Sequence, residues 1–379
     1  MNNDLFYRVT VKAGSASFDL SPDISSLTVE ESGSGPAQLS VEAPDPYKVY
    51  SHALQEGMEI ETDLGFVSDH AVIFRGRVAK AEGSFPRKEI PSVRILAYDQ
   101  SMSMGLRKRN RIWTDTSLKK IVGDIASDYF GNNDIKIDLK GDPGFKGNGI
   151  RQQDETDLAF LLRLGSAYGC EMFAVSGEEK SELYFKSQYN IMRETPPVTL
   201  YHDRLGAADG LLSFDAAADI AKIQLPRVFA GSDYDTGELI QQVTAPVEIV
   251  GDVTDSFADE NLARFTGTYP ERADAIKGLL SAAEAVYGRL REELGSVDRE
   301  ISTGFTTRDE LSKRAENQFS TSIRGMSASG SAMGTHRIHA QSTICIADVG
   351  GRFSGIWYLS HVRHILDREG YLTEFQCKR

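Results

Sequence analysis

Cysteine pairs and long apolar runs are both missing from the 379-residue sequence. Its three cysteines, Cys170, Cys345 and Cys377, form no CxxC pair and show no metal-binding spacing. We therefore expect buried thiols in a protein that folds in a reducing compartment. No stretch approaches the roughly 20 apolar residues needed to span a bilayer, and the first residues lack the apolar segment of a signal peptide. The sequence thus predicts a protein made in the cytoplasm, with no membrane span and no cleavable export signal.

Net positive charge is missing as well. The chain carries 55 acidic and 42 basic residues, a formal net charge of −13. A generic nucleic-acid binder needs a basic surface, so this balance argues against that class, while it allows a surface or channel that repels polyanions. The one dense basic run, Arg107–Arg111 beside Trp113, is interpreted as a solvated loop or an interface patch. A nucleic-acid binder that relies on this run is the third hypothesis for the chain.

Common catalytic motifs are also absent, since the sequence has no HExxH, no GxSxG and no Walker loop. The segment Ser32–Pro36 lacks the Lys-Ser/Thr ending of a phosphate loop, and we interpret it as a hairpin loop. Two histidine pairs, His336/His339 and His361/His364, lie in strand-like stretches where residues three apart face opposite sides. Neither pair can chelate one ion without help from elsewhere. We expect no catalytic residue, no cofactor and no metal; the acidic residues leave a glycosidase pair open, with nothing in its support.

Strand-like alternation dominates residues 1–100. The clearest examples are Leu5–Lys12, Gln38–Ala43, Glu59–Asp63, Val72–Ala81 and Ser92–Tyr98, separated by turn residues. Six or more short strands without a convincing helix predict a small antiparallel barrel or sandwich.

Residues 107–195 change to a mixed pattern. An amphipathic helix is predicted to stop at Gly131, followed by a strand over Asp134–Leu139 and a glycine-rich loop over Gly141–Gly149. The apolar face of this helix comprises Leu118, Ile121, Val122, Ile125 and Tyr129. The start of the segment also resembles a LysM peptidoglycan-binding repeat, but the second helix of that module is missing, so this is the weaker interpretation.

The stretch Gln152–Phe173 predicts a mostly buried helix that leads into a strand. Asp154 is the expected N-cap, and Glu155 and Asp157 add negative charge to the first turn. Apolar residues then recur at helical spacing. Gly169 is expected to end the helix in a left-handed cap, with a strand over Cys170–Val175.

After a boundary at Pro196–Pro197, strands are predicted over 211–214, 221–229 and 238–250, and residues 256–325 read as strongly helical. Pro270 suits a first helical position, and Thr307 with Glu310 forms a capping box for a second helix through Leu311, Ala315 and Phe319. The apolar stripe of the long helix fits packing on its own domain and packing on a neighbouring subunit equally well. That stripe comprises Ile276, Leu279, Leu280, Ala283, Val286, Tyr287, Leu290 and Leu294.

The end of the chain is again strand-like and resembles its beginning. Trp357–Ile365 and Tyr371–Cys377 predict a hairpin closed by residues 367–370. Phe74–Val78 and Phe353–Trp357 each place a glycine at the same interval before the end of such a hairpin. Chance likeness of two hairpins is the alternative. The pattern suggests two related β-domains with α+β and helical material between them.

Two motifs resemble one family, the baseplate hub proteins of contractile injection systems. It is also called the phage late control protein D family, and it includes the N-terminal half of type VI secretion spike proteins. The first motif comprises Gln152, Glu155, Thr156, Asp157, Phe160, Leu161, Arg163, Leu164 and Gly169. The second comprises Gly350, Phe353, Gly355, Tyr358, His364, Gly370, Tyr371, Thr373 and Phe375.

The resemblance implies an α+β, mostly β fold with two tube-like antiparallel β-barrel domains, an α+β domain and a helical insertion. The corresponding ranges are 1–105 for the first barrel, 106–195 for the α+β domain, 196–255 and 326–379 for the second barrel, and 256–325 for the insertion. The helical stretch is longer than the minimal family pattern needs. The chain ends at Arg379 without an OB-fold or β-helical needle, so the spike is expected to be a separate protein.

The implied function is structural, with no enzymatic activity. A homotrimer would adapt the six-fold tail tube to the three-fold central spike and form a channel, with an acidic wall as a hypothesis. The implied partners are further copies of the chain, the central spike protein, the tail tube or tube-initiator protein, the tape measure protein and the baseplate wedge, without a specific nucleic-acid sequence. The implied location is the tail baseplate of the virion, assembled in the host cytoplasm; a bacteriocin or another injection system stays open.

The alternative from another class is a cell-wall-binding or peptidoglycan-hydrolysing tail protein. It predicts a saccharide cleft with paired carboxylates, which the hub interpretation does not.

Overall fold

The computed structural model describes residues 4–33, 35–146, 149–177, 179–202, 210–219, 222, 227–243, 256–293, 298–317 and 325–379. It confirms the predicted fold class, because the chain is mostly β with antiparallel sheets. The strands of the first half are β1 (Leu5–Ala13), β2 (Ala16–Asp19), β3 (Ser26–Ser32), β4 (Gln38–Pro44), β5 (Glu59–Phe66), β6 (Asp69–Ser84), β7 (Ser92–Asp99), β8 (Lys108–Trp113), β9 (Thr116–Ser117), β10 (Ile135–Asp138), β11 (Gly144–Phe145), β12 (Ile150–Thr156), β13 (Cys170–Ser176) and β14 (Ser181–Ser187). Those of the second half are β15 (Thr199–Tyr201), β16 (Leu211–Ala218), β17 (Arg227–Asp233), β18 (Leu239–Val243), β19 (Asp298–Thr306), β20 (Met326–Met333), β21 (Thr343–Ala347), β22 (Gly355–Asp367) and β23 (Gly370–Lys378). The α-helices are α1 (Tyr50–Ala53), α2 (Leu118–Ala126), α3 (Asp157–Tyr168), α4 (Gln188–Arg193), α5 (Ser256–Thr268), α6 (Ala273–Glu293) and α7 (Arg308–Asn317).

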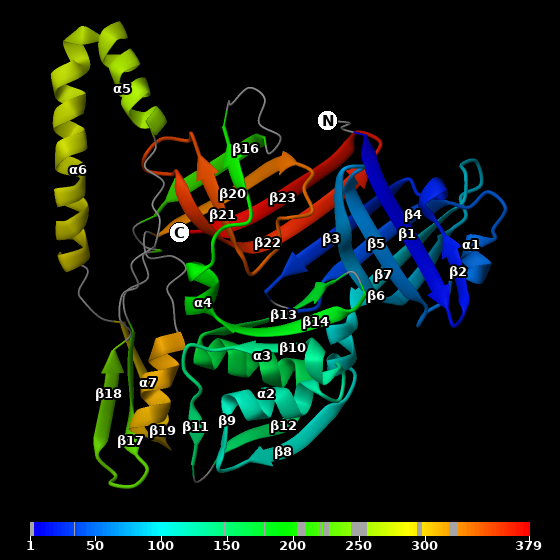
Figure 1. Ribbon diagram of the computed structural model, residues 1–379, viewed down its shortest axis with the longest axis horizontal. Helices are drawn as coiled ribbons and strands as arrows, with labels where there is room; N and C mark the ends of the chain where they lie inside the picture. Colours follow the sequence, from blue (N-terminus) through cyan, green and yellow to red (C-terminus); the bar gives the residue numbers. More distant parts are fainter. Residues whose placement is uncertain are drawn as a thin grey trace.

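A single 13-stranded sheet joins the two ends of the chain (Figure 1). Its main path is β16-β20-β23-β22-β3-β4-β7-β6-β5-β1-β2, with β21 beside β22 and β15 beside β21. The junction is the antiparallel pairing of His361–Leu366 in β22 with Leu27–Ser32 in β3. The N-terminal and C-terminal parts of the sequence are therefore hydrogen-bonded neighbours.

The same strand order occurs twice in this sheet. Strands β3-β4-β7-β6-β5 form the first set and β16-β20-β23-β22-β21 the second, and the members of each set follow one another in the same order along the chain. Phe74–Val78 lies in β6, and Phe353–Trp357 runs into β22, its counterpart in the second set. We call these two sets the first and second β units. In the first unit a short hairpin joins β3 to β4, whereas in the second the whole segment 219–325 separates β16 from β20.

Each β unit has its own hydrophobic core. The alternation of β4 turns Leu39 and Val41 into the first core, and Trp357 and Phe375 lie in the second. Strand β22 serves both, since Val362 packs in the second core while Leu366 packs in the first. Apolar burial as well as backbone pairing therefore connects the two units at the β3–β22 junction.

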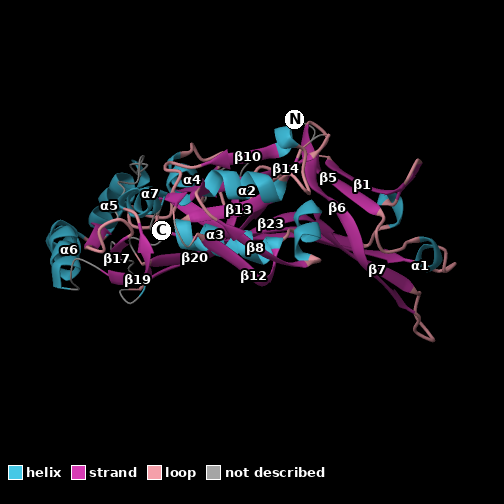
Figure 2. Ribbon diagram, turned by 90° about the horizontal axis from the view of Figure 1, so that it is seen from below, coloured by secondary structure: helices cyan, strands magenta, loops and turns pink. Residues whose placement is uncertain are grey.

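Helices α2 and α3 pack with the β10-β14-β13 sheet and the β8–β12 pair in a separate α+β module (Figures 1 and 2). Four of the five residues predicted for the apolar face of α2, Leu118, Ile121, Val122 and Ile125, are in the helix and fully buried. The fifth, Tyr129, lies beyond the end of the helix and is partly buried. The predicted stop at Gly131 is wrong: α2 ends at Ala126, and Gly131 has a φ of −62°, outside the left-handed region. After Ala126 the chain forms tighter turns instead, in which the backbone N–H groups of Asp128 and Tyr129 each donate to the carbonyl three residues earlier.

The segment 227–317 departs from the sequence-based expectation. Strands β17 and β18 belong to a separate three-stranded sheet of order β18-β17-β19, so they do not extend the second β unit. Residues 298–306, expected to be helical, form β19, which pairs in parallel with β17. The β-branched residues Ile301, Thr303 and Thr306 in this stretch favour a strand. The predicted strand residues 223–226 and 244–250 lie outside the described part of the chain.

Helix α7 packs on this small sheet and on the α+β module. Leu311 and Ala315 bury against β17 and β18. The side chain of Asn317, completely buried, accepts hydrogen bonds from the backbone N–H of Gly141 and donates to its carbonyl at 2.7 Å. The predicted cap is present, since Thr307 Oγ1 accepts from the backbone N–H of Glu310 at 3.1 Å. Phe319, the predicted end of this helix, lies outside the described residues.

Helices α5 and α6 form a hairpin at one end of the molecule (Figure 1). Its apolar stripe stays open in the single chain: Leu279, Leu280 and Val286 are 68%, 52% and 55% exposed. Leu294 and the side chains of Tyr287 and Leu290 lie outside the described part. Among the described helices, none combines the length and apolar character that crossing a bilayer requires.

Candidate functional site

The first family-like motif lies where β12 ends and α3 begins. The pairing of β12 with β8 shifts register between Gln152 and Glu155, and Asp154 sits in this irregularity with a φ of 48°. Helix α3 therefore begins later than predicted: Thr156, not Asp154, is the N-cap, and its Oγ1 accepts from the backbone N–H of Ala159 at 3.2 Å. The bulge redirects the chain from strand to helix at this point.

Asp157 is the centre of a buried polar network. Its carboxylate is completely buried and accepts hydrogen bonds from Gln152 Nε2 at 2.7 Å and the Tyr129 hydroxyl at 2.7 Å. The guanidinium of Arg111 lies 3.1 Å from the same carboxylate. The network ties β8, β12, α3 and the segment after α2 together, so its role is to fix the entry of α3.

A second ion pair supports this entry from outside. Arg163 of α3 binds both carboxylate oxygens of Glu155, at 2.5 and 3.2 Å, and donates to the carbonyl of Arg151 at 2.8 Å. The motif residues Phe160, Leu161 and Leu164 are buried in the module's core, and the guanidinium of Arg163 lies 5.1 Å from the centre of the Phe160 ring. Gly169 ends the helix at φ 67° and ψ 36°, as predicted.

The basic run Arg107–Arg111 faces acidic residues of its own chain. Lys108 lies 3.1 Å from Asp154, and Arg111 bridges Asp157 and Asp128. Two of the four cations in the run, Lys108 and Arg111, are thus paired within the chain, which reduces its net positive charge.

The second motif shapes the start of β22. The carbonyl of Gly350, at φ 86°, accepts from the backbone N–H groups of Phe353 and Ser354. A Cβ at Gly355, whose φ is 131°, would lie 2.5 Å from the guanidinium of Arg379. Both positions have a positive φ that favours glycine, and at Gly355 the close approach of Arg379 adds to this preference.

The middle of the motif anchors this strand to its neighbours. Tyr358 packs against Ile191 and Met192 of α4, and burial, followed by the nearby Glu171, raises its pKa well above the usual value. Phe375 lies in the second core beside β22, and Gly370 takes a φ of 129° in the β22–β23 turn.

The three remaining residues of the second motif, His364, Tyr371 and Thr373, lie together in one polar cluster. His364 Nδ1 lies 2.9 Å from the Tyr371 hydroxyl and 3.4 Å from Thr373 Oγ1. Thr373 Oγ1 also accepts from the backbone N–H of Thr335 at 3.0 Å. His364 and Thr373 are completely buried. The sequence singled out these residues, and the structure brings them together.

One histidine of each pair joins Glu31, a residue that the sequence analysis missed. His339 Nδ1 is 3.0 Å from Glu31 Oε1, the backbone N–H of Ala340 donates to Glu31 Oε2 at 2.9 Å, and one donor atom each of Glu31, His339 and His364 lie within 4.8 Å of one another. The other two histidines face different acids, His336 with Asp69 and His361 with Glu30. No local signal marks Glu31, because it lies about 300 residues earlier in the sequence.

The three groups differ in their titration. Burial, the largest single cause, would raise the pKa of the Glu31 carboxyl. The charge and hydrogen bond of His339, the charge of His364 and the backbone N–H of Ala340 together outweigh it and hold the pKa below its usual value. Burial would lower the pKa of His339, and Glu31 raises it above the usual value. Burial lowers the pKa of His364 to about 4, so this imidazole is neutral at neutral pH.

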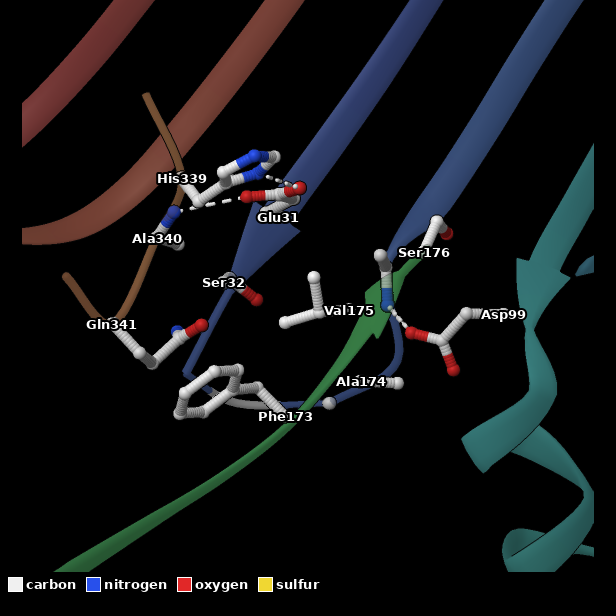
Figure 3. Close-up of a pocket in the computed structure, with 12 residues that line it drawn as sticks. Glu31, Ser32, Asp99, Phe173, Ala174, Val175, Ser176, His339, Ala340 and Gln341 are labelled. Atoms are coloured by element: carbon white, nitrogen blue, oxygen red, sulfur yellow. Dashed lines mark hydrogen bonds and ion pairs between the residues drawn. The ribbon is translucent and has the colours of Figure 1, made fainter. Parts of the chain in front are cut away.

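A cavity of about 30 Å³ adjoins this cluster (Figure 3). Glu31 and His339 face each other at one side of it, Asp99 lies at another, and Phe173 and Val175 of β13 line it from the α+β module. This volume has room for about two or three water molecules. It is too small for an organic substrate.

A second, shallow pocket of about 510 Å³ lies between β11, β17 and the start of α7. Three of its four aspartates are engaged: Asp233 accepts from the backbone N–H groups of Asp235 and Thr236, Asp235 pairs with Lys146, and Asp309 pairs with Lys313. Backbone hydrogen bonds, first of all from Thr236, hold the pKa of Asp233 below its usual value. A glycosidase needs a carboxylic acid of raised pKa, which Asp233 is not.

Comparisons with known proteins agree on one class. A family model described as phage tail baseplate hub (GPD) matches residues 38–238, more than half of the chain. No curated protein matches. Among solved structures, a 43 kDa tail protein of prophage MuSo2 from Shewanella oneidensis is 13% identical with a TM-score of 0.60, over 99% of this chain and 98% of that one.

Two further structures support the same fold. A tail protein from Neisseria meningitidis MC58 is 10% identical, with a TM-score of 0.60, over 98% of this chain and 96% of that one. The E. coli c3393 protein is 11% identical, with a TM-score of 0.56, over 98% of this chain and 76% of that one. It is described as a component of the type VI secretion system with structural similarity to the T4 bacteriophage tail proteins gp27 and gp5.

Proposed function

Because the chain belongs to the phage tail baseplate hub family, we propose that it forms a homotrimer at the centre of a tail baseplate. The trimer adapts the six-fold tail tube to the three-fold spike and encloses a channel. The observation that carries this proposal is the strand order that occurs twice, as β3-β4-β7-β6-β5 and β16-β20-β23-β22-β21. Three chains with two such units each present six similar units in a ring, which is the geometry a six-fold partner requires.

The ring interfaces are proposed to lie at the two ends of the sheet path. Among the described strands, β2 pairs only with β1, and β16 pairs only with β20. Each carries an exposed large apolar side chain, Phe18 at 47% and Leu212 at 58%. Neither strand contains proline or lysine, the residues that commonly block edge pairing. These edges can therefore extend the sheet from one chain to the next.

Aspartate at these two positions tests the interface. We expect Phe18→Asp and Leu212→Asp to weaken trimer formation by at least about 10-fold each, because burying either side chain contributes about 1.5–3 kcal/mol. Sedimentation velocity over a concentration series measures the shift from trimer to monomer. Val67→Asp, an exposed apolar residue (53%) in the β5–β6 turn, is the matched control. Trimers of unchanged strength in both edge variants would rule out this interface.

Other features are part of the same proposal. The partners are the central spike protein, the tail tube or tube-initiator protein, the tape measure protein and the baseplate wedge, and the site of action is the virion tail after assembly in the host cytoplasm. The E. coli structure of similar fold is described as similar to the T4 bacteriophage tail proteins gp27 and gp5, which is consistent with a place in a tail. The motif residues act by holding α3 and β22 in place, without covalent chemistry.

The domain boundaries form a proposal as well. We keep 1–105 for the first barrel and 106–195 for the α+β domain. In the second barrel, the pairing of β16 with β20 limits the inserted material to about 219–325, which holds the β17-β18-β19 sheet and helices α5, α6 and α7.

A further inference from the structure

We propose that Glu31, His339 and His364 bind one zinc ion, which links the first and second β units. The three residues come from separate parts of the chain: Glu31 from β3, His364 from β22, and His339 from the connection between β20 and β21. One donor atom of each lies within 4.8 Å of the other two. An ion at this point connects β3 and β22, the two strands of the junction, to the segment between β20 and β21.

The distance between the donor atoms of His339 and Glu31 suits a metal ion in place of the proton that they share in a hydrogen bond. His339 Nδ1 and Glu31 Oε1 are 3.0 Å apart. Zinc bonds of about 2.0–2.2 Å place neighbouring tetrahedral ligands roughly 3.3–3.5 Å apart. Small side-chain rotations therefore bring a nitrogen, an oxygen and the second imidazole to bonding distance.

His364 has the environment of a ligand. Its Nδ1 is held by the Tyr371 hydroxyl and by Thr373 Oγ1, at 2.9 and 3.4 Å. Its Nε2 is completely buried and makes no hydrogen bond of normal geometry, although a backbone group of Ile338 lies close enough to the ring to raise its pKa. A buried orphan nitrogen is costly, whereas an imidazole oriented through one nitrogen and free at the other is the usual arrangement of a zinc-bound histidine.

The chemistry and the space both indicate a structural zinc site. Two imidazoles and one carboxylate favour zinc over magnesium or calcium, which prefer oxygen ligands. The cavity of about 30 Å³ beside Glu31 and His339 accommodates one water as the fourth ligand. It leaves no room for a substrate.

The chain supplies a matched control. Glu30 and His361, adjacent to the site on the same two strands, also form a carboxylate–imidazole pair, at 2.8 Å. The cluster of three donor groups found among the described residues does not include them. They reproduce the chemistry of the Glu31–His339 pair without the third ligand.

The test is zinc binding by the folded full-length chain after treatment with a chelator. Isothermal titration with zinc sulfate, and metal analysis after gel filtration, are expected to give one zinc per chain. Cobalt(II) in place of zinc is expected to give the intense visible absorption of a tetrahedral site. Zinc is also expected to raise the midpoint temperature of thermal unfolding of the wild-type chain, because an ion bound at the junction stabilises the folded state.

Variants decide whether these residues hold the ion. His339→Asn and Glu31→Gln, both at partly exposed positions, should each weaken zinc binding by more than about 100-fold, since loss of an outer-shell partner alone costs 10–100-fold. His361→Asn and Glu30→Gln should leave it unchanged. No stoichiometric zinc in the folded wild-type chain, or equal affinity in the His339 and Glu31 variants, would overturn the proposal. This outcome is independent of the hub function, which does not require the metal.

Discussion

Asp157→Asn is expected to lower the free energy of unfolding of the α+β module by about 3 kcal/mol. The carboxylate is completely buried and accepts hydrogen bonds from Gln152 and Tyr129 while it pairs with Arg111. Asparagine has nearly the same shape as aspartate, but its amide NH₂ group would face the hydrogen-bond donors that the carboxylate accepts from. The negative charge that pairs with Arg111 would also be lost. The loss therefore combines unsatisfied buried donors with an Arg111 that keeps only its longer pair, to Asp128 at 3.7 Å.

The two tryptophans allow this effect to be measured locally. Trp113 packs against the core of the α+β module and Trp357 lies in the second β unit. In a Trp357→Phe background, the urea-induced change in Trp113 fluorescence reports on the module that Asp157 supports. Asp154→Asn is the control, because that carboxylate is 73% exposed and its pair with Lys108 contributes less than about 1 kcal/mol. Equal effects of the two substitutions would contradict the assigned role of Asp157.

Trp357→Ala is expected to destabilise the second β unit by about 4 kcal/mol, because a fully buried tryptophan leaves a large cavity. Its ring meets Phe214 of β16 edge to face at 5.4 Å, and its Nε1 donates to the carbonyl of Phe353 at 2.9 Å. Phe214 lies before the long insertion and Trp357 after it. The substitution therefore weakens the contact that assembles this unit from two distant segments.

Hydrogen exchange followed by mass spectrometry locates the effect. Peptides from β16, β20, β22 and β23 should exchange faster in Trp357→Ala, while peptides from α2 and α3 should change little. Trp113→Ala, at a half-buried position in the other module, should show the reverse pattern. Uniform acceleration over the whole chain in both variants would argue against separate cores.

Local signals in the sequence were sufficient where short-range physics decides the structure. Gly169 was recognisable as a left-handed cap because only the residues just before it matter, and the cap is present. The buried face of α2 followed from spacing alone. The N-cap of α3 was placed at Asp154 instead of Thr156, because the bulge that delays the helix arises from pairing with β8, about 45 residues earlier.

Long-range pairing explains the remaining differences. Nothing near Leu27–Ser32 indicates that it pairs with His361–Leu366, so the β3–β22 junction was not predictable. The same holds for Glu31, which meets His339 and His364 only through that pairing. Strand β19 was hidden in a stretch with helical neighbours, and its partner β17 lies about 70 residues away. In each case the deciding contact is a tertiary one, which no local propensity encodes.

The central claim is that this hub forms a trimer, and the molar mass in solution tests it most directly. Multi-angle light scattering on the purified full-length chain, with and without the spike protein of the same tail, measures this mass. The account predicts three chains per particle, either for the chain alone or after addition of the spike. A chain that stays monomeric at all concentrations and in the presence of the spike would contradict it.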